Sequence, residues 1–222
     1  MRAMIRFGKQ PRLRFISHLD LQRFFQRALN RTGLPIAFTQ GFTPHPVLSF
    51  GSALALGWTS EYEIIDFKLA VPMGKKRTED ALRGALPADL PVLEVRLVDD
   101  RHPAPMSMVR ASDYTITGEG EAFERVLAAV PEFLARDTVM AVRKTKSGEK
   151  EIDIRPMAFS LTVEDSALYA RLKLSDLETL KPDLLVRALA EIAGTEAPEV
   201  RIHRRTLLGE DESGELKPLM EL

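Results

Sequence analysis

A proline-rich connection near the middle of this chain of 222 residues separates two stretches that share one expected order of elements. The connection, Arg101-His102-Pro103-Ala104-Pro105, has the composition of a linker. On each side, hydrophobic periodicity predicts strand, helix, two strands, helix and strand, with residues 138–155 as an inserted hairpin that turns at Ser147-Gly148. Two helices then cover one face of each sheet. We therefore predict an α+β protein made of two tandem ferredoxin-like (βαββαβ) domains with antiparallel sheets, residues 1–102 and 103–222.

The first predicted helix has the clearest local signals. Ser17 can cap it, and Asp20 follows three residues later, as a capping box requires. The helix buries one apolar stripe, formed by Leu21, Phe24, Phe25, Ala28 and Leu29. Alternation of charged and apolar residues predicts strands at 2–8 and 12–15, with the arginines pointing outward. Further strands are predicted at 47–56, 61–71, 91–98, 114–117, 158–163, 168–174 and 200–208, and further helices at 78–86, 123–130 and 184–192.

Composition excludes several classes of function. The chain has no cysteine, which excludes disulfides, a thiolate nucleophile, a zinc–thiolate site and a cysteine-ligated iron–sulfur cluster. Its four histidines are widely separated, and no glycine-rich phosphate-binding motif is present, so we predict neither a metal nor a cofactor. No secretory signal and no apolar run long enough to span a membrane is visible, so we expect a cytoplasmic protein without a membrane partner.

Charge is distributed unevenly along the chain. Residues 1–60 contain eight basic side chains and one acidic side chain, Asp20, for a net charge of +7. The rest of the chain has 23 basic and 31 acidic residues, for a net charge of −8. Such polarity is typical of a protein with an anionic partner, although the two parts of the chain can also attract each other.

The first predicted helix carries a basic stripe opposite its apolar one. Arg23, Arg27 and Arg31 are spaced by four and share one helical face, where they repel each other. A phosphate suits the fork of a guanidinium group and would relieve this repulsion. The alternative is a solvated face whose arginines pair with acidic residues elsewhere.

A polar loop without charge follows, within a stretch from Thr32 to Ser60 that has no charged side chain. In Gln40-Gly41-Phe42-Thr43-Pro44-His45-Pro46 the flanking prolines restrain His45, so the direction of its ring is largely preset. Such a loop can line a site for a flat, hydrogen-bonding ligand or contact a partner. The alternative is a structured turn in which His45 binds backbone carbonyls.

Three segments together resemble the radical-SAM-linked protein family, a bacterial domain of unknown function. They are Arg14-Phe15-Ile16-Ser17-His18-Leu19-Asp20, the segment 40–50, and Lys150-Glu151-Ile152-Asp153-Ile154-Arg155-Pro156. In that family the domain occurs alone or fused to a cobalamin-binding radical S-adenosylmethionine (SAM) protein. The resemblance implies association with a radical SAM enzyme and with RNA metabolism, and no established reaction comes with it. Without cysteines, this chain is expected to be a companion of that enzyme rather than the radical enzyme itself.

These observations predict a non-catalytic accessory protein that binds structured RNA or a ribosomal component through its first domain. Two alternatives stay open: a protein-only adaptor for the radical SAM partner, and a metal-independent endoribonuclease that uses His18 and His45 as acid and base. The predicted binding residues, drawn from the basic stripe and from the motifs of the resemblance, are Arg14, Ser17, His18, Asp20, Arg23, Arg27, Arg31, Gln40, Phe42, His45, Ser49, Asp153 and Arg155.

Overall fold

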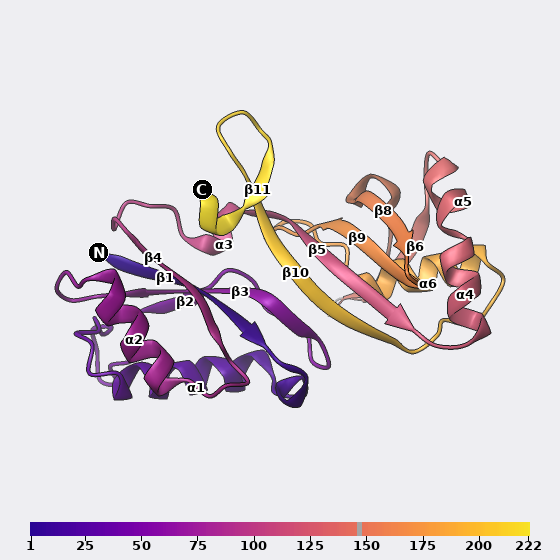
Figure 1. Ribbon diagram of the computed structural model, residues 1–222. Coiled ribbons are helices and arrows are strands. Elements are labelled where there is room, and N and C mark those ends of the chain that lie inside the picture. The colour runs from indigo at the N-terminus through magenta and orange to yellow at the C-terminus, as the bar shows by residue number, and fades with distance from the viewer. Residues whose placement is uncertain (146–147) are drawn as a thin grey trace. The chain divides into compact units, whose positions relative to one another are not determined.

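The computed structural model describes residues 1–145 and 148–222, and the chain divides into two compact units (Figure 1). Unit 1 consists of Met1–Val109 and Thr206–Leu222, and unit 2 consists of Arg110–Arg205. This partition differs from the ranges 1–102 and 103–222 expected from the sequence, both at the linker and at the C-terminal end. The fold is mixed α+β with mostly antiparallel sheets, as predicted.

Unit 1 has an antiparallel sheet with strand order β4-β1-β3, and β2 pairs with β3. Helices α1 and α2 lie on the same side of this sheet (Figure 1). In chain order the elements are β1 (Arg2–Lys9), η1 (Pro11–Leu13), α1 (His18–Arg31), β2 (Leu48–Phe50), β3 (Thr59–Lys68), α2 (Lys75–Ala85), β4 (Val92–Val98) and α3 (Pro105–Met108).

Aromatic rings form the centre of the core between α1 and this sheet. The Phe7 ring lies 4.8 Å from the Phe25 ring and 6.3 Å from the Phe50 ring, and all three side chains are buried. Rings at these separations interact favourably beyond the apolar area they bury. The middle of α1 is thereby packed against β1 and β2.

The C-terminal segment belongs to unit 1 because its backbone is bonded to the sheet. Strand β11 (Leu216–Pro218) pairs antiparallel with β10 (Val200–Glu210), and η3 (Leu219–Glu221) follows. The Met220 amide donates to the Tyr62 hydroxyl at 3.1 Å, and Arg96 donates to the carbonyl oxygens of Met220 and Leu222. These contacts explain why the partition departs from the predicted boundaries.

Unit 2 has the strand order β10-β5-β9-β8, in which β5–β9 and β8–β9 are antiparallel. A separate hairpin of β6 and β7 occupies the predicted insertion, and Ser147 of its expected turn lies outside the described residues. Besides β10, the elements are β5 (Val109–Gly118), α4 (Glu121–Ala128), α5 (Val130–Ala135), β6 (Met140–Thr145), β7 (Gly148–Asp153), η2 (Arg155–Met157), β8 (Ala158–Glu164), β9 (Ala167–Lys173) and α6 (Pro182–Ile192).

Two predicted strands differ most from the structure, and the strand predicted at 114–117 is longer, as β5 (Val109–Gly118). The strand predicted at 12–15 was wrong: Pro11 starts the 3₁₀ helix η1, in which the Leu13 amide donates to the Gln10 carbonyl at 3.0 Å. The strand predicted at 47–56 is limited to β2. The chain leaves the ladder at Gly51, where a Cβ atom would lie 3.2 Å from the Cβ of Ile64.

No helix in the described part of the chain is long and apolar enough to cross a membrane.

Candidate functional site

The N-terminus of α1 forms one of the two hydrogen bonds of the predicted capping box, and the Asp20 carboxylate contacts the Ser17 hydroxyl instead of the Ser17 amide. Ser17 is the N-cap, and its Oγ accepts the Asp20 amide at 3.2 Å. The Ser17 hydroxyl donates in turn to Oδ2 of Asp20 at 2.7 Å, while Oδ1 of Asp20 lies 3.5 Å from Nη1 of Arg23. The capping hydrogen bond satisfies an amide that helix geometry leaves without a partner. The carboxylate of Asp20 is therefore held at the solvent-exposed start of the helix.

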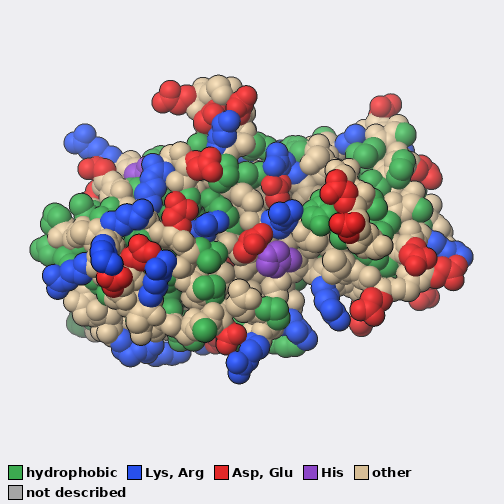
Figure 2. Space-filling view, in the orientation of Figure 1, with side chains coloured by type: hydrophobic (Ala, Val, Ile, Leu, Met, Phe, Trp, Pro, Cys, Tyr) green, Lys and Arg blue, Asp and Glu red, His purple; other side chains and the backbone are tan. Residues whose placement is uncertain are grey.

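The basic stripe of α1 is exposed along its whole length. Arg23, Arg27 and Arg31 are exposed, and the opposite face of the helix is buried in the core. Arg23 reaches Asp20, whereas the described residues offer no ion-pair partner to Arg27 or Arg31. Figure 2 shows Lys and Arg side chains gathered along the lower edge of the view, where α1 runs in Figure 1. Along most of its length, this stripe is therefore not neutralised by ion pairs among the residues that the structure describes.

A buried lysine shapes the segment that enters α1. Lys9 is 1% exposed, and its Nζ donates to the carbonyl oxygens of Arg14 at 3.2 Å and Ile16 at 2.9 Å. Burial lowers the pKa of Lys9, and the nearby Glu63 carboxylate opposes this shift. By binding two carbonyls two residues apart, Lys9 turns Phe15 outward, where its ring is 69% exposed. The Arg14 guanidinium lies over that ring, 4.6 Å from its centroid.

A cavity of about 340 Å³ opens beside this segment. Most of its lining is apolar, with one carboxylate and one guanidinium group among it. The lining residues are Leu13, Phe15, Ile16, Asp20, Leu21, Phe24, Arg27, Pro87 and Leu90. Such a combination of apolar walls and a few polar groups is typical of a ligand site. The Asp20 carboxylate and Arg27 of the basic stripe therefore lie beside an apolar surface.

The predicted loop around His45 is an exposed turn closed by its own hydrogen bonds. The Thr39 amide donates to the His45 carbonyl at 2.9 Å, and the His45 amide donates to Oγ1 of Thr39 at 3.2 Å. Nδ1 of His45 lies 3.2 Å from Oγ1 of Thr39 and 3.3 Å from the Thr43 carbonyl oxygen. Gln40 is exposed, and Phe42 stands fully in solvent after Gly41, whose φ of +128° favours glycine. The loop therefore presents an aromatic tip.

His18 and His45 have different surroundings. His18 is the first residue of α1, and its ring lies 4.9 Å from the Phe50 ring in an edge-on arrangement, at the margin of the core. His45 is exposed in the loop described above. Ser49 lies on β2 opposite Asp66 and is half-buried. The endoribonuclease alternative stays a prediction.

Comparison with known proteins identifies the family. The sequence model for uncharacterized proteins conserved in bacteria (DUF2344) matches residues 2–182. The chain belongs to this family. Its match covers all three segments singled out in the sequence, and so it includes every predicted binding residue. No curated protein matches the chain.

Two of the predicted residues in the DUF2344 match lie in unit 2 and make local contacts there. Oδ1 of Asp153 accepts the amides of Val139 at 2.9 Å and Arg155 at 3.0 Å. The Arg155 guanidinium donates to the Leu134 carbonyl at 3.1 Å and lies 5.8 Å from the centroid of the Phe133 ring. These contacts join the end of the β6–β7 hairpin to η2, and η2 to α5. We therefore build the candidate site from unit 1 alone.

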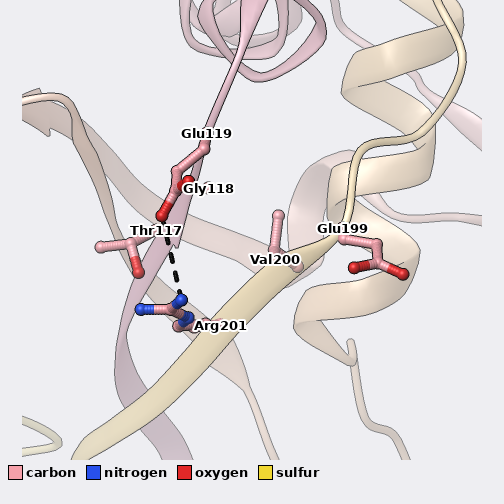
Figure 3. Close-up of a pocket in the computed structure, with 6 residues that line it drawn as sticks. All are labelled: Thr117, Gly118, Glu119, Glu199, Val200 and Arg201. Carbon is pink, nitrogen blue, oxygen red and sulfur yellow. Dashed lines mark ion pairs between the residues drawn. The ribbon is translucent and has the colours of Figure 1, made fainter.

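Unit 2 of this DUF2344 protein has a second cavity, of about 450 Å³, at the ends of β5 and β10 (Figure 3). Glu119 and Arg201 face each other across it at 3.8 Å, and both side chains are about 90% exposed. Glu199 points away from this pair in Figure 3. Arg201 of this cavity is thus paired with Glu119, and none of the predicted binding residues lines the cavity.

The site in unit 1 includes residues that the sequence pattern did not reveal. Phe15 was expected inside a strand, and Lys9 was not singled out at all. Pro87 and Leu90 follow α2 and reach the cavity only through tertiary packing. Pro11 was the one local signal for this part of the site, because a proline there is compatible with the start of a helical turn. In the described part of the chain, no three acidic or histidine side chains group as metal ligands do.

Proposed function

We propose that this protein is a non-catalytic accessory protein that binds RNA along α1 of unit 1. The observation that carries this proposal is the exposed row of Arg23, Arg27 and Arg31, of which the last two have no ion-pair partner among the described residues. Arginine is suited to phosphate because its planar fork can make two parallel hydrogen bonds. A polyanion along this row would relieve the repulsion between the three charges.

The exposed aromatic side chains favour RNA over a simple anion. Phe15 stands beside the cavity near the start of α1, and Phe42 stands at the tip of the loop after the helix. Proteins that bind single-stranded nucleic acid combine a basic track with aromatic rings on which bases stack. Unit 1 offers both features, which supports a single-stranded or looped RNA as the ligand.

Two further parts of the proposal rest on other observations. Association with a radical SAM enzyme follows from the sequence resemblance, and in such a pair this chain would hold the substrate while its cysteine-containing partner reacts with it. The ferredoxin-like fold of both units is supported by the strand orders β4-β1-β3 with β2 on β3, and β10-β5-β9-β8. In that fold one face of the sheet is covered by helices, so α1 is free to present its outer face.

The experiment is the salt dependence of RNA binding, measured by fluorescence anisotropy with a labelled single-stranded RNA. For the triple variant Arg23→Ala/Arg27→Ala/Arg31→Ala, we expect the slope of log affinity against log salt to flatten by about 2 to 3 units. The matched control removes three exposed positive charges elsewhere, with Arg77→Ala/Lys181→Ala/Arg187→Ala. The control should keep the original slope.

Two results would overturn the proposal. The first is an intact protein with no measurable affinity for RNA in dilute salt. The second is an equal loss of slope in both triple variants, which would show a general charge effect. Cleavage of the RNA in EDTA that disappears in both His18→Ala and His45→Ala would support the endoribonuclease instead.

One observation favours a second candidate, the protein-only adaptor. Phe38, Phe42 and Val47 are exposed apolar side chains within a stretch that has no charge. Exposed apolar clusters mark protein contact sites. The adaptor predicts co-purification with the radical SAM protein that survives high salt and nuclease and is lost in Phe42→Ser. Loss of the complex after nuclease treatment would contradict it.

A further inference from the structure

We infer that the cavity at the start of α1 binds a guanine base of single-stranded RNA, with Asp20 as the residue that recognises the base. This inference rests on the proposed function, because it requires RNA on α1. It adds a base preference that the basic stripe cannot provide, since contacts to phosphate position a nucleic acid without reading its sequence.

The cavity has three kinds of group that can bind a nucleotide: aromatic rings, a guanidinium group and a carboxylate. Its walls are apolar and include the Phe15 and Phe24 rings, on which a flat base can stack. Arg27 lines the same cavity and continues into the basic stripe, so the phosphate of the bound nucleotide can lie on that side. Asp20 is the acidic residue in the lining, and it is also the only acidic residue among residues 1–60.

The fixed orientation of Asp20 favours one base over the others. An ionised carboxylate has two acceptor oxygens and no donor. Guanine presents two neighbouring N–H donors, N1–H and the N2 amino group, on its Watson–Crick edge. The same edges of adenine, cytosine and uracil carry no two neighbouring donors, so each of these bases would place an acceptor against one of the carboxylate oxygens. Asp20 is held by the Ser17 hydroxyl at 2.7 Å and by its own capped amide, which leaves lone pairs on both oxygens.

The charge arrangement explains why an acidic residue is tolerated on an RNA-binding face. Asp20 lies 3.5 Å from Arg23, so the guanidinium offsets the repulsion between the carboxylate and a nearby phosphate. A base is neutral and reaches the carboxylate through N–H groups. Without such a ligand, a carboxylate at this place only weakens the attraction for RNA.

The test uses labelled RNA pentamers of uridine that carry guanosine, inosine or adenosine at the centre, with affinities measured at one fixed salt concentration. For the intact protein we expect guanosine to bind roughly ten-fold more tightly than adenosine, as for a good bidentate base contact. Inosine lacks the N2 amino group and should fall between them. In Asp20→Asn the preference for guanosine over adenosine should shrink to less than about two-fold.

The control separates recognition from helix capping. Ser17→Ala removes the N-cap and the hydrogen bond that orients the carboxylate but keeps the carboxylate itself, so its guanosine preference should lie between that of the intact protein and that of Asp20→Asn. Asp20→Asn should also bind adenosine RNA at least as tightly as the intact protein does, because it removes a negative charge from the RNA-binding face.

The outcomes distinguish this inference from the proposed function. If the pentamers bind with a salt slope that depends on the basic stripe, but guanosine, inosine and adenosine bind equally, the inference is wrong and the proposed function stands. A guanosine preference that persists in Asp20→Asn likewise rules out this residue as the reader. If no pentamer binds, both this inference and the proposed function are wrong, and the cavity would instead accept an apolar side chain of a protein partner.

Discussion

A buried carboxylate in the sheet of unit 1 predicts an unusual pH dependence of stability. Asp66 on β3 is 4% exposed, and burial raises its pKa from 3.8 to about 6. Arg2, whose Nη1 lies 3.5 Å from Oδ2 of Asp66, opposes this shift without cancelling it, and the nearby Asp100 adds to it. In the part of the chain that the structure describes, Oδ1 of Asp66 has no hydrogen-bond partner. Ionised Asp66 therefore costs stability.

The size and sign of the effect follow from proton linkage. A difference of about two pKa units corresponds to ~3 kcal/mol between the ionised and protonated forms. Between about pH 4 and pH 6 the folded protein holds this proton while the unfolded chain releases it. The contribution of Asp66 to stability is thus present at low pH and is lost as the pH rises through 6. Acidic residues in ion pairs that lower their pKa produce the opposite trend.

The perturbation is Asp66→Asn, which keeps the shape of the side chain and removes its titration. We expect the variant to gain up to about 3 kcal/mol relative to the intact protein between pH 4 and pH 7. Urea unfolding followed by the fluorescence of Trp58 suits the measurement, because Trp58 is the only tryptophan and is buried in unit 1 with Asp66. Comparison of the two proteins at each pH cancels the titration of all other groups.

A stability difference that does not change with pH would refute this reasoning. A difference of the opposite sign would mean that the ion pair with Arg2 outweighs the cost of burial. Direct titration of the Asp66 carboxyl group by NMR provides a second readout, with an expected midpoint near 6. A midpoint below 4 would show that burial does not raise the pKa of Asp66, and the linkage argument itself would be unaffected.

Two further predictions concern positions that shape unit 1. Lys9→Met removes the donor to the Arg14 and Ile16 carbonyls. We expect the free energy of unfolding to fall by roughly 1–3 kcal/mol, and the affinity for every RNA tested to fall by the same factor. Unchanged affinity in the anisotropy assay would contradict a positioning role for Lys9. Gly209→Ala would place a Cβ atom 2.8 Å from the Met108 carbonyl oxygen, so we expect a loss of about 1–3 kcal/mol in thermal unfolding. In the control Gly84→Ala, the new Cβ atom meets open space in a helix, so the free energy of unfolding should rise by ~0.5–1 kcal/mol. Similar behaviour of the two variants would argue against the close approach at Gly209.

The sequence predicted α1 well because its signals are local. The apolar spacing places Leu21, Phe25, Ala28 and Leu29 on the buried face, and Ser17 caps the helix as expected. Helical periodicity and capping depend on residues within a few positions of each other, so no knowledge of the rest of the fold is required. The basic stripe follows from the same periodicity, and its exposure was predictable for that reason.

The segment between β1 and α1 shows where local pattern fails. Alternation of charged and apolar residues at 12–15 predicted a strand, but the segment forms η1 and a turn. Its conformation depends on Lys9, a charged side chain that is buried because two backbone carbonyls bind it. Sequence patterns treat lysine as a surface residue, so they cannot anticipate a lysine that organises a loop from the inside.

The cavity and the extent of unit 1 depend on contacts between distant parts of the chain. Pro87 and Leu90 join Leu13 and Leu21 in the cavity wall although more than sixty residues separate the two groups. The C-terminal segment is bonded to Tyr62 and Arg96, which lie over a hundred residues earlier. Neither arrangement has a periodic signal, because tertiary packing rather than local propensity determines it.

The structure also clarifies the charge asymmetry of the sequence. Several of the basic residues in the first sixty positions pair with acidic residues outside that stretch: Arg2 with Asp66 at 3.5 Å, and Arg6 with Glu94 at 3.6 Å. A few acidic residues later in the chain, among them Glu79, Glu121 and Glu132, pair with an arginine four residues further on. The charges of Arg2 and Arg6 on β1 are therefore paired with carboxylates, whereas the described residues offer no carboxylate partner to Arg27 and Arg31 on α1. For this reason the salt dependence of the proposed RNA binding should come chiefly from α1, although the basic residues of the first sixty positions are spread from Arg2 to Arg31.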